Sequence, residues 1–117
     1  MTMYREMTDQ ERKLLSSLLA RPFPGRDQIR DQVGSALVEQ VDANGSLAFK
    51  INSTVLCEDV KYAVPTEGEY LDADGMSVHI LLHVIGDSVF SVEVYREDLK
   101  RLLNPIDIDK MEVFSPE

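Results

Sequence analysis

The sequence has a single cysteine, Cys57, and no long apolar run. One cysteine cannot form an intrachain disulfide or a cysteine-based zinc site, so the fold must rest on packing. A membrane-spanning helix needs about 18 or more consecutive apolar residues, and a secretory signal needs a basic region followed by an apolar one. Neither pattern occurs, so we expect a cytoplasmic domain that does not enter a membrane.

Glycine is scarce as well. The six glycines are dispersed singly along the chain, so there is no glycine-rich loop of the kind that holds a phosphate. No internal repeat or low-complexity stretch is present. The sequence therefore predicts no bound cofactor.

Basic residues are outnumbered, with 12 lysines and arginines against 21 aspartates and glutamates and a net charge of −9. The imbalance is uneven, because residues 1–35 have a balance of +1 and residues 36–117 a balance of −10. A negative field repels nucleic acid and anionic lipid and speeds encounter with a basic partner. Plain solubility is the competing explanation of the same charge.

A length of 117 residues with 44% hydrophobic residues is typical of one globular domain with one core. We predict a single domain over residues 1–117 of the α+β class. One or two N-terminal helices should pack on one face of an antiparallel β-meander of four to six strands. The helical start is expected over 8–34, the meander over 36–96, and a short helix and tail over 97–117.

The helical start opens at Thr8, because Thr8 and Glu11 have the spacing of a capping box. Leucines then recur at helical spacing on one face, and Arg21-Pro22 ends the helix, since proline disfavours the α conformation in the residue before it. A second, shorter helix is expected from Arg26 to Val33. The recurring leucines are Leu14, Leu15, Leu18 and Leu19.

After Gly34 the hydrophobic pattern alternates with the period of a strand. A hairpin is expected over 37–51, followed by strands ending near Tyr70 and spanning 76–85 and 89–96. The path of residues 52–65 stays open, because the strand formers there lead into a proline. Residues 98–103 suit a helical turn, and the tail over 106–114 suits an edge strand.

The register between the strands 76–85 and 89–96 depends on the length of the loop that joins them, because each loop length buries a different set of side chains. A three-residue loop at 86–88 pairs Ile85 with Val89 and Val84 with Phe90, and it keeps carboxylates out of the core. The core face then comprises Val78, Ile80, Leu82, Val84, Phe90, Val92 and Val94. The outer face pairs His79 with Tyr95, Leu81 with Glu93, His83 with Ser91, and Ile85 with Val89.

Two patterns resemble metal sites and are incomplete. Asp72 and Asp74 lack the remaining ligands of a calcium loop, so residues 72–75 are expected to form a hairpin turn. His79 and His83 would lie about 13 Å apart on a strand, too far to share a metal. The two histidines suit a solvated or interface role, or a pH-sensitive contact next to Tyr95 or Ser91.

Cys57 is the one candidate for a reactive thiol. Glu58 and Asp59 follow it, and their charge raises the thiol pKa and opposes formation of a thiolate. A partly buried structural thiol is expected instead. The sequence therefore predicts no catalytic residue and no metal site.

The acidic segment 58–74 is the main candidate for partner binding. It contains six carboxylates against Lys61 alone, interleaved with two tyrosines, a combination that suits a basic groove on a partner. A solvated loop and a strand edge protected by charge are the alternative. Together with the outer face, the candidate binding residues are Glu58, Asp59, Tyr62, Glu67, Glu69, Tyr70, Asp72, Asp74, His79, His83, Glu93 and Tyr95.

Four segments of the sequence resemble known proteins: residues 45–49 (Gly-Ser-Leu-Ala-Phe), 72–78, 82–84 and 90–98. Over roughly residues 5–103 the chain resembles an uncharacterised family of small bacterial proteins with a helical start followed by a meander. More loosely, it is similar to the immunity proteins that neutralise toxins of contact-dependent and polymorphic toxin systems. The resemblance implies inhibition of a toxin and assigns no catalytic residue.

The function predicted from these features is a non-enzymatic protein-binding module, in its most concrete form an immunity-type inhibitor that occludes a cationic toxin site. One alternative is self-association, as a homodimer, through Leu81, Ile85, Val89 and Tyr95. Another is an enzyme or a small-ligand carrier, either of which would need a deep pocket. Neither nucleic acid nor a membrane is expected as a partner.

Overall fold

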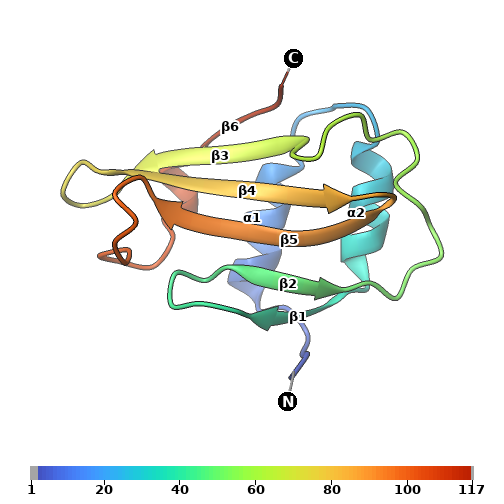
Figure 1. Cartoon of the computed structure of the whole chain (residues 1–117), viewed down its shortest axis with the longest axis horizontal. Coiled ribbons are helices and arrows are strands. Elements are labelled where there is room, and N and C mark those ends of the chain that lie inside the picture. The colour runs from blue at the N-terminus through green and yellow to red at the C-terminus, as the bar shows by residue number, and fades with distance from the viewer. Residues whose placement is uncertain (1–2, 117) are drawn as a thin grey trace.

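The computed structural model describes residues 3–116. Two helices and a six-stranded antiparallel sheet form an α+β fold, which confirms the predicted fold class (Figure 1). Within the described residues, neither helix has the length and apolar character needed to cross a bilayer. The elements are α1 (Asp9–Leu18), α2 (Arg26–Gly34), β1 (Leu37–Gln40), β2 (Leu47–Lys50), β3 (Thr66–Leu71), β4 (Ser77–Ile85), β5 (Ser88–Arg96), the 3₁₀ turn η1 (Ile108–Lys110) and β6 (Glu112–Phe114).

Both helices begin as the sequence predicts. At α1 the Glu11 N–H donates to Thr8 Oγ1, and the Thr8 N–H donates to the Glu11 carboxylate, so the capping box is complete. The four leucines of the predicted stripe are buried. The helix ends at Leu18, ahead of the predicted stop at Arg21. Helix α2 follows Gly25, whose φ of 85° favours glycine and which has no room for a Cβ beside Val60.

The strand order is β1-β2-β5-β4-β3-β6. Strands β3, β4 and β5 form a meander, whereas the β1–β2 hairpin pairs with β5 rather than with β3. The segment 51–65 makes this order possible, because it carries the chain past one end of the sheet from β2 to β3 (Figure 1). The segment forms no strand of its own.

A buried amide fixes the segment 51–65 to α2. Gln32 is 1% exposed. Its Nε2 donates to the carbonyl oxygens of Val55 (2.7 Å) and Asp87 (3.0 Å), and its Oε1 accepts from the N–H of Val89 (2.9 Å). One side chain therefore joins the helix, the long connection and the β4–β5 turn.

The β4–β5 turn differs from the prediction. Ile85 pairs with Ser88 and Val84 with Val89 across a two-residue turn, and a bulge then restores the predicted pairing of His83 with Ser91. The predicted three-residue loop is therefore wrong at the turn. Val89 is buried, and Phe90, predicted to lie in the core, is 56% exposed. The positive φ of Gly86 allows the tighter turn, and the bulge keeps Glu93 on the outer face.

Residues 98–103 form an irregular loop instead of the predicted helical turn, and Leu99 has a positive φ of 63°. The predicted edge strand in the tail is present but shorter, since only Glu112–Phe114 pair with β3.

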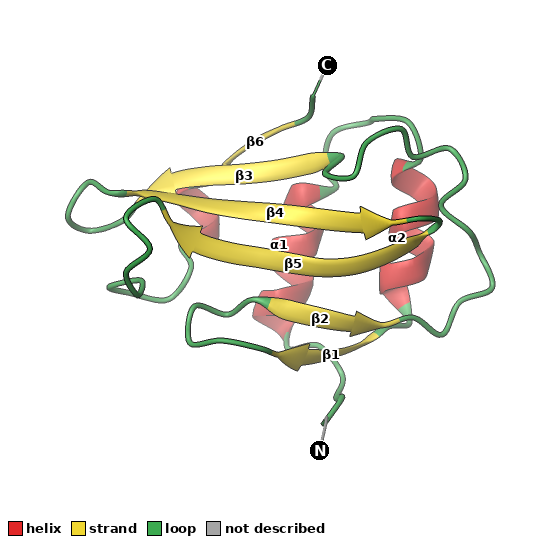
Figure 2. Cartoon of the chain, in the orientation of Figure 1, coloured by secondary structure: helices red, strands yellow, loops and turns green. Residues whose placement is uncertain are grey.

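Both helices lie against the same face of the sheet, behind it in the view of Figure 2. The face of the sheet opposite the helices is here called the open face.

Candidate functional site

The open face is built by the side chains that alternate outward from the six strands. The register places Glu69, His79 and Tyr95 in one row across β3, β4 and β5, and Glu67, Leu81 and Glu93 in the next. Each of these side chains is partly or fully exposed. The predicted outer-face pairs are therefore confirmed, except at Ile85.

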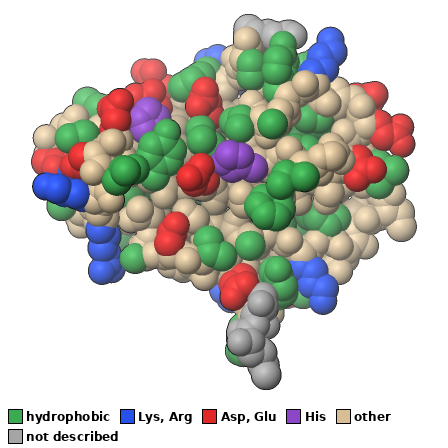
Figure 3. Space-filling view, in the orientation of Figure 1, with side chains coloured by type: hydrophobic (Ala, Val, Ile, Leu, Met, Phe, Trp, Pro, Cys, Tyr) green, Lys and Arg blue, Asp and Glu red, His purple; other side chains and the backbone are tan. Residues whose placement is uncertain are grey.

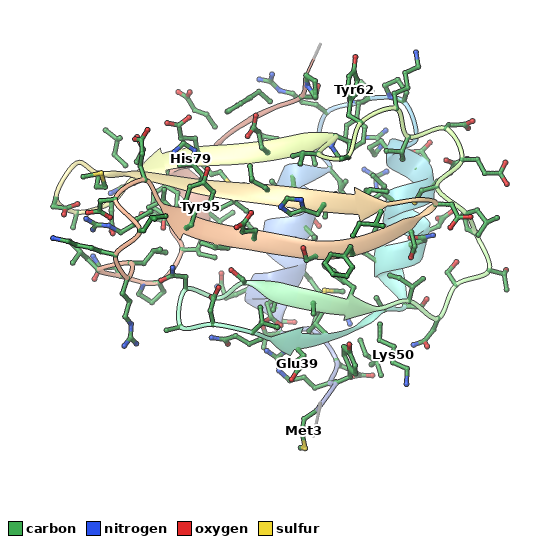
Figure 4. All side chains as sticks on the ribbon, viewed as in Figure 1. Met3, Glu39, Lys50, Tyr62, His79 and Tyr95 are labelled. Atoms are coloured by element: carbon green, nitrogen blue, oxygen red, sulfur yellow. The ribbon has the colours of Figure 1, made fainter. Side chains whose placement is uncertain are left out.

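Two contacts order the centre of the open face. The rings of His79 and Tyr95 stack, with centroids 5.0 Å apart, and both are labelled in Figure 4. Next to them, His83 Nε2 lies 3.0 Å from a Glu93 carboxylate oxygen. These neighbours hold both imidazoles in place on strands, which are more rigid platforms than loops.

Large apolar side chains are exposed around these pairs. The fractional exposure is 58% for Leu71, 61% for Ile85, 56% for Phe90 and 38% for Phe114. Figure 3 shows the apolar groups spread over this face, with one histidine near its middle and the other toward the upper left. Exposed apolar patches bordered by polar groups are typical of interaction surfaces.

Carboxylates predominate among the charged groups of the open face. One carboxylate comes from β1, two from β3, one from β5 and one from β6, whereas Lys50 is the one lysine or arginine that the described strands direct to this face. Lys50 lies at the β1–β2 edge, with its Nζ 6.0 Å from the Tyr4 ring centroid (Figure 4). The carboxylates are Glu39, Glu67, Glu69, Glu93 and Glu112.

The twelve predicted binding residues do not form one surface. Six of them meet on the open face: Glu67, Glu69, His79, His83, Glu93 and Tyr95. Glu58 and Asp59 lie in the segment 51–65, where Asp59 exchanges hydrogen bonds with Gln28 of α2. Tyr62 borders a small hollow of about 210 Å³ at one end of the sheet, with Phe23 and several prolines.

Tyr70, Asp72 and Asp74 belong to the interior and to a turn. Tyr70 is 6% exposed, and burial raises the pKa of its hydroxyl. Asp72 is also buried, and Asp74 forms an ion pair with Arg96. The predicted acidic segment therefore does not form one surface. Side chains of β3 alternate between the open face and the core, and the turn after β3 directs its carboxylates to Arg96.

Arg96 is the centre of a buried ionic cluster that sequence reasoning missed. Its side chain is 3% exposed and contacts three carboxylates, at 3.0 Å from Asp72, 2.9 Å from Asp74 and 2.7 Å from Asp98. Asp72 also accepts a hydrogen bond from the N–H of Leu103 at 2.9 Å. The cluster joins the β3–β4 turn, the end of β5 and the loop 98–103. The sequence does contain a signal for this cluster. Arg96 alternates with Val92 and Val94 on the core face of β5, and a charge at a buried position requires a buried partner.

The cluster predicts acid sensitivity. The Leu103 N–H is the main cause that lowers the pKa of Asp72, whereas hydrogen bonds from Arg96 lower the pKa of Asp74 and bring that of Asp98 to about 2. A carboxyl with a lowered pKa in the folded state stabilises the fold above its unfolded pKa, about 4, and this contribution is lost as the pH falls through the folded value. We expect the urea midpoint to fall between about pH 4 and pH 2.

The control for this prediction is Asp98→Asn, measured by urea unfolding over the same pH range. It removes one of the titrating groups and should therefore flatten the pH dependence while lowering stability at pH 7. A wild-type midpoint that stays constant from pH 4 to pH 2 would contradict the assignment.

The remaining candidate chemistry is structural. Cys57 is buried, and its thiol pKa is raised by desolvation first and by the charge of Asp87 second. Among residues 3–116, no three side chains of His, Cys, Asp or Glu converge as ligands for a metal ion. The open face presents polar, charged and apolar groups together.

The comparisons with known proteins locate the chain in a family. No match was found among curated proteins or among solved structures. The family model described as "Domain of unknown function (DUF6984)" matches residues 4–114, a span that includes both helices and all six strands. The chain therefore belongs to the DUF6984 family.

Proposed function

We propose that this chain is a non-enzymatic protein-binding domain whose open face docks onto a basic surface of a partner protein. The observation that supports this most is the uncovered face itself. Four large apolar side chains are exposed there among five carboxylates, although the opposite face is closed by both helices. A solvated sheet face with no binding role would be expected to bear polar residues at those positions.

The composition of the face suits a basic partner. Apolar side chains such as Ile85 and Phe90 supply contact area, and the surrounding carboxylates steer and orient a cationic surface. In its most concrete form the domain is an immunity-type inhibitor that occludes the cationic active site of a toxin. The single thiol of the chain is a poor nucleophile, because Cys57 is buried and its pKa is raised.

Self-association through the same face is the second candidate, favoured by the exposed Ile85 and Phe90. Val89, one of the residues expected to take part, is buried and contributes nothing to it. A symmetric dimer would bring the carboxylates of two copies together, and facing like charges oppose association. We therefore favour a basic partner over a second copy.

The experiment is an affinity capture from the source organism with three immobilised baits. The first is the wild-type chain, the second is the double variant Glu67→Lys/Glu69→Lys, and the third is the double variant Asp31→Lys/Glu58→Lys. The two variants change net charge equally at exposed or half-exposed positions, but only the Glu67/Glu69 variant alters the open face. Circular dichroism verifies that all three baits are folded. Asp72 and Asp74 are unsuitable for charge reversal, because both form ion pairs with the buried Arg96.

The wild type and the Asp31/Glu58 variant should retain the same basic protein, released by salt, and the Glu67/Glu69 variant should retain at least about tenfold less of it. Purified partner and bait should then reproduce this order of affinities by calorimetry. Equal retention by both variants, or capture of acidic proteins only, would refute the proposed face. Growth of the wild-type mass with concentration in sedimentation would instead favour self-association.

A further inference from the structure

A hollow of about 840 Å³ lies away from the open face. It is lined by α1 and the residues before it, by the β1–β2 hairpin and by the loop 101–108. We call it the α1 groove. Its volume is in the range of small-molecule sites, and part of its wall is apolar. The apolar lining residues are Leu14, Ala43, Leu102, Leu103, Pro105, Ile106 and Ile108.

The charge of the α1 groove is opposite to that of the molecule. Its charged lining residues are Arg5, Glu11 and Arg101, so cations outnumber anions there in a chain of net charge −9. Glu11 is already neutralised, because its two carboxylate oxygens accept from Arg5 at 2.7 and 3.0 Å. The guanidinium hydrogen bond lowers the pKa of Glu11, so this carboxylate stays ionised and paired.

Arg101 is the unpaired cation of the α1 groove. Across the described residues its guanidinium forms no ion pair. The nearby carboxylates of Asp107 and Asp109 already face Lys110 (3.7 Å) and Lys13 (3.1 Å). An anion that enters the groove would therefore meet a guanidinium without having to displace a bound carboxylate.

The backbone around Arg101 is held in place on both sides. The Lys100 N–H donates to Asp98 (3.0 Å), and the Leu102 N–H donates to the side-chain oxygen of Asn44 (3.0 Å). Asp98 is in turn fixed by Arg96. The buried cluster thus fixes the wall of the groove before any ligand arrives, which reduces the entropy lost on binding.

We propose that the α1 groove binds a small organic acid, with its anionic group at Arg101 and an apolar body against Leu102, Ile106 and Ile108. The apolar wall favours a hydrocarbon body over a highly charged sugar phosphate, and the single unpaired guanidinium favours one anionic group. This binding is independent of the protein-binding function proposed for the open face, because the two sites share no residue.

The test uses octanoate, a carboxylate with eight carbon atoms in all, and follows the ¹⁵N-labelled protein by NMR. Octanoate should shift the backbone amides of Asn44, Gly45, Leu102 and Ile106, with a dissociation constant on the order of 1 mM for a ligand of this size. Octylammonium, which has the same chain and the opposite charge, should leave these amides unchanged.

Two charge reversals decide the role of Arg101. Arg101→Glu should weaken octanoate binding at least about tenfold, whereas Lys100→Glu, an equal charge change at an exposed neighbour outside the groove, should alter it less than about twofold. Shifts confined to the open face, equal effects of both variants, or equal binding of octylammonium would overturn the proposal. Since no partner protein is present, none of these results depends on the function of the open face.

Discussion

Replacement of Arg96 by alanine is expected to lower the melting temperature by more than about 10 °C. The variant removes the cation that pairs with Asp72, a side chain that is 2% exposed and is held in place by the Leu103 N–H. An ionised carboxylate that loses its buried partner must either be neutralised or become hydrated, and both outcomes disrupt the turn and the loop that it joins. Thermal unfolding followed by circular dichroism measures the effect.

Two further variants separate the cluster from a general effect of arginine. Arg12 is exposed on α1 and takes part in no ion pair of the described chain, so Arg12→Ala should stay within about 2 °C of the wild type. Arg96→Lys keeps the charge but not the planar fork that reaches three carboxylates, so its melting temperature should be intermediate. A melting temperature of Arg96→Ala within about 3 °C of the wild type would contradict a structural role for the cluster.

The second large effect is expected at Gln32. Gln32→Leu retains the volume of the side chain but leaves the Val89 N–H and the Val55 carbonyl without their partner. Buried polar groups that lose their hydrogen bonds cost about 1–3 kcal/mol each, so the free energy of unfolding should fall by about 2–6 kcal/mol. Urea unfolding measures this loss.

Cys57 provides a local measurement of the same change, because it lies in the segment that Gln32 fixes and is the single thiol of the chain. Gln32→Leu should increase the rate at which a maleimide labels Cys57 at least about tenfold. Gln10 is exposed on α1, so Gln10→Leu makes the same replacement outside this contact and should change neither quantity appreciably. If both variants label at the wild-type rate, Gln32 does not anchor the segment.

The local signals in the sequence were sufficient for both helices, for the long strands and for most of the core, but not for residues 98–103 or for Phe90. The capping box at Thr8, the leucine stripe of α1 and the alternation in β4 and β5 each correspond to one physical requirement, and the structure satisfies all three. The register shows where such signals end. A two-residue turn followed by a bulge gives the same pairing of His83 with Ser91 as a three-residue loop, so parity could not distinguish them. Only Val89 and Phe90 change sides.

The candidate site could be predicted only in part, because burial of a carboxylate depends on distant residues. Glu69 and Asp72 are both carboxylates of the acidic segment 58–74, and the sequence does not distinguish them. In the structure, Glu69 lies on the open face and Asp72 is buried beside Arg96, 24 positions away. Likewise, the connection 51–65 is fixed by Gln28 and Gln32 of α2 and not by its own strand formers. Long-range polar contacts of this kind leave no periodic pattern in the sequence.

Carboxylate footprinting tests most directly whether the open face meets the partner. The chain, free and in complex with the captured partner, is labelled with a carbodiimide and glycinamide, and each site is quantified by mass spectrometry. Binding through the open face predicts that the complex protects Glu67, Glu69 and Glu93, whereas Asp31 and Glu58 react as in the free chain. Protection of Asp31 and Glu58 with unchanged labelling of Glu67, Glu69 and Glu93 would contradict it.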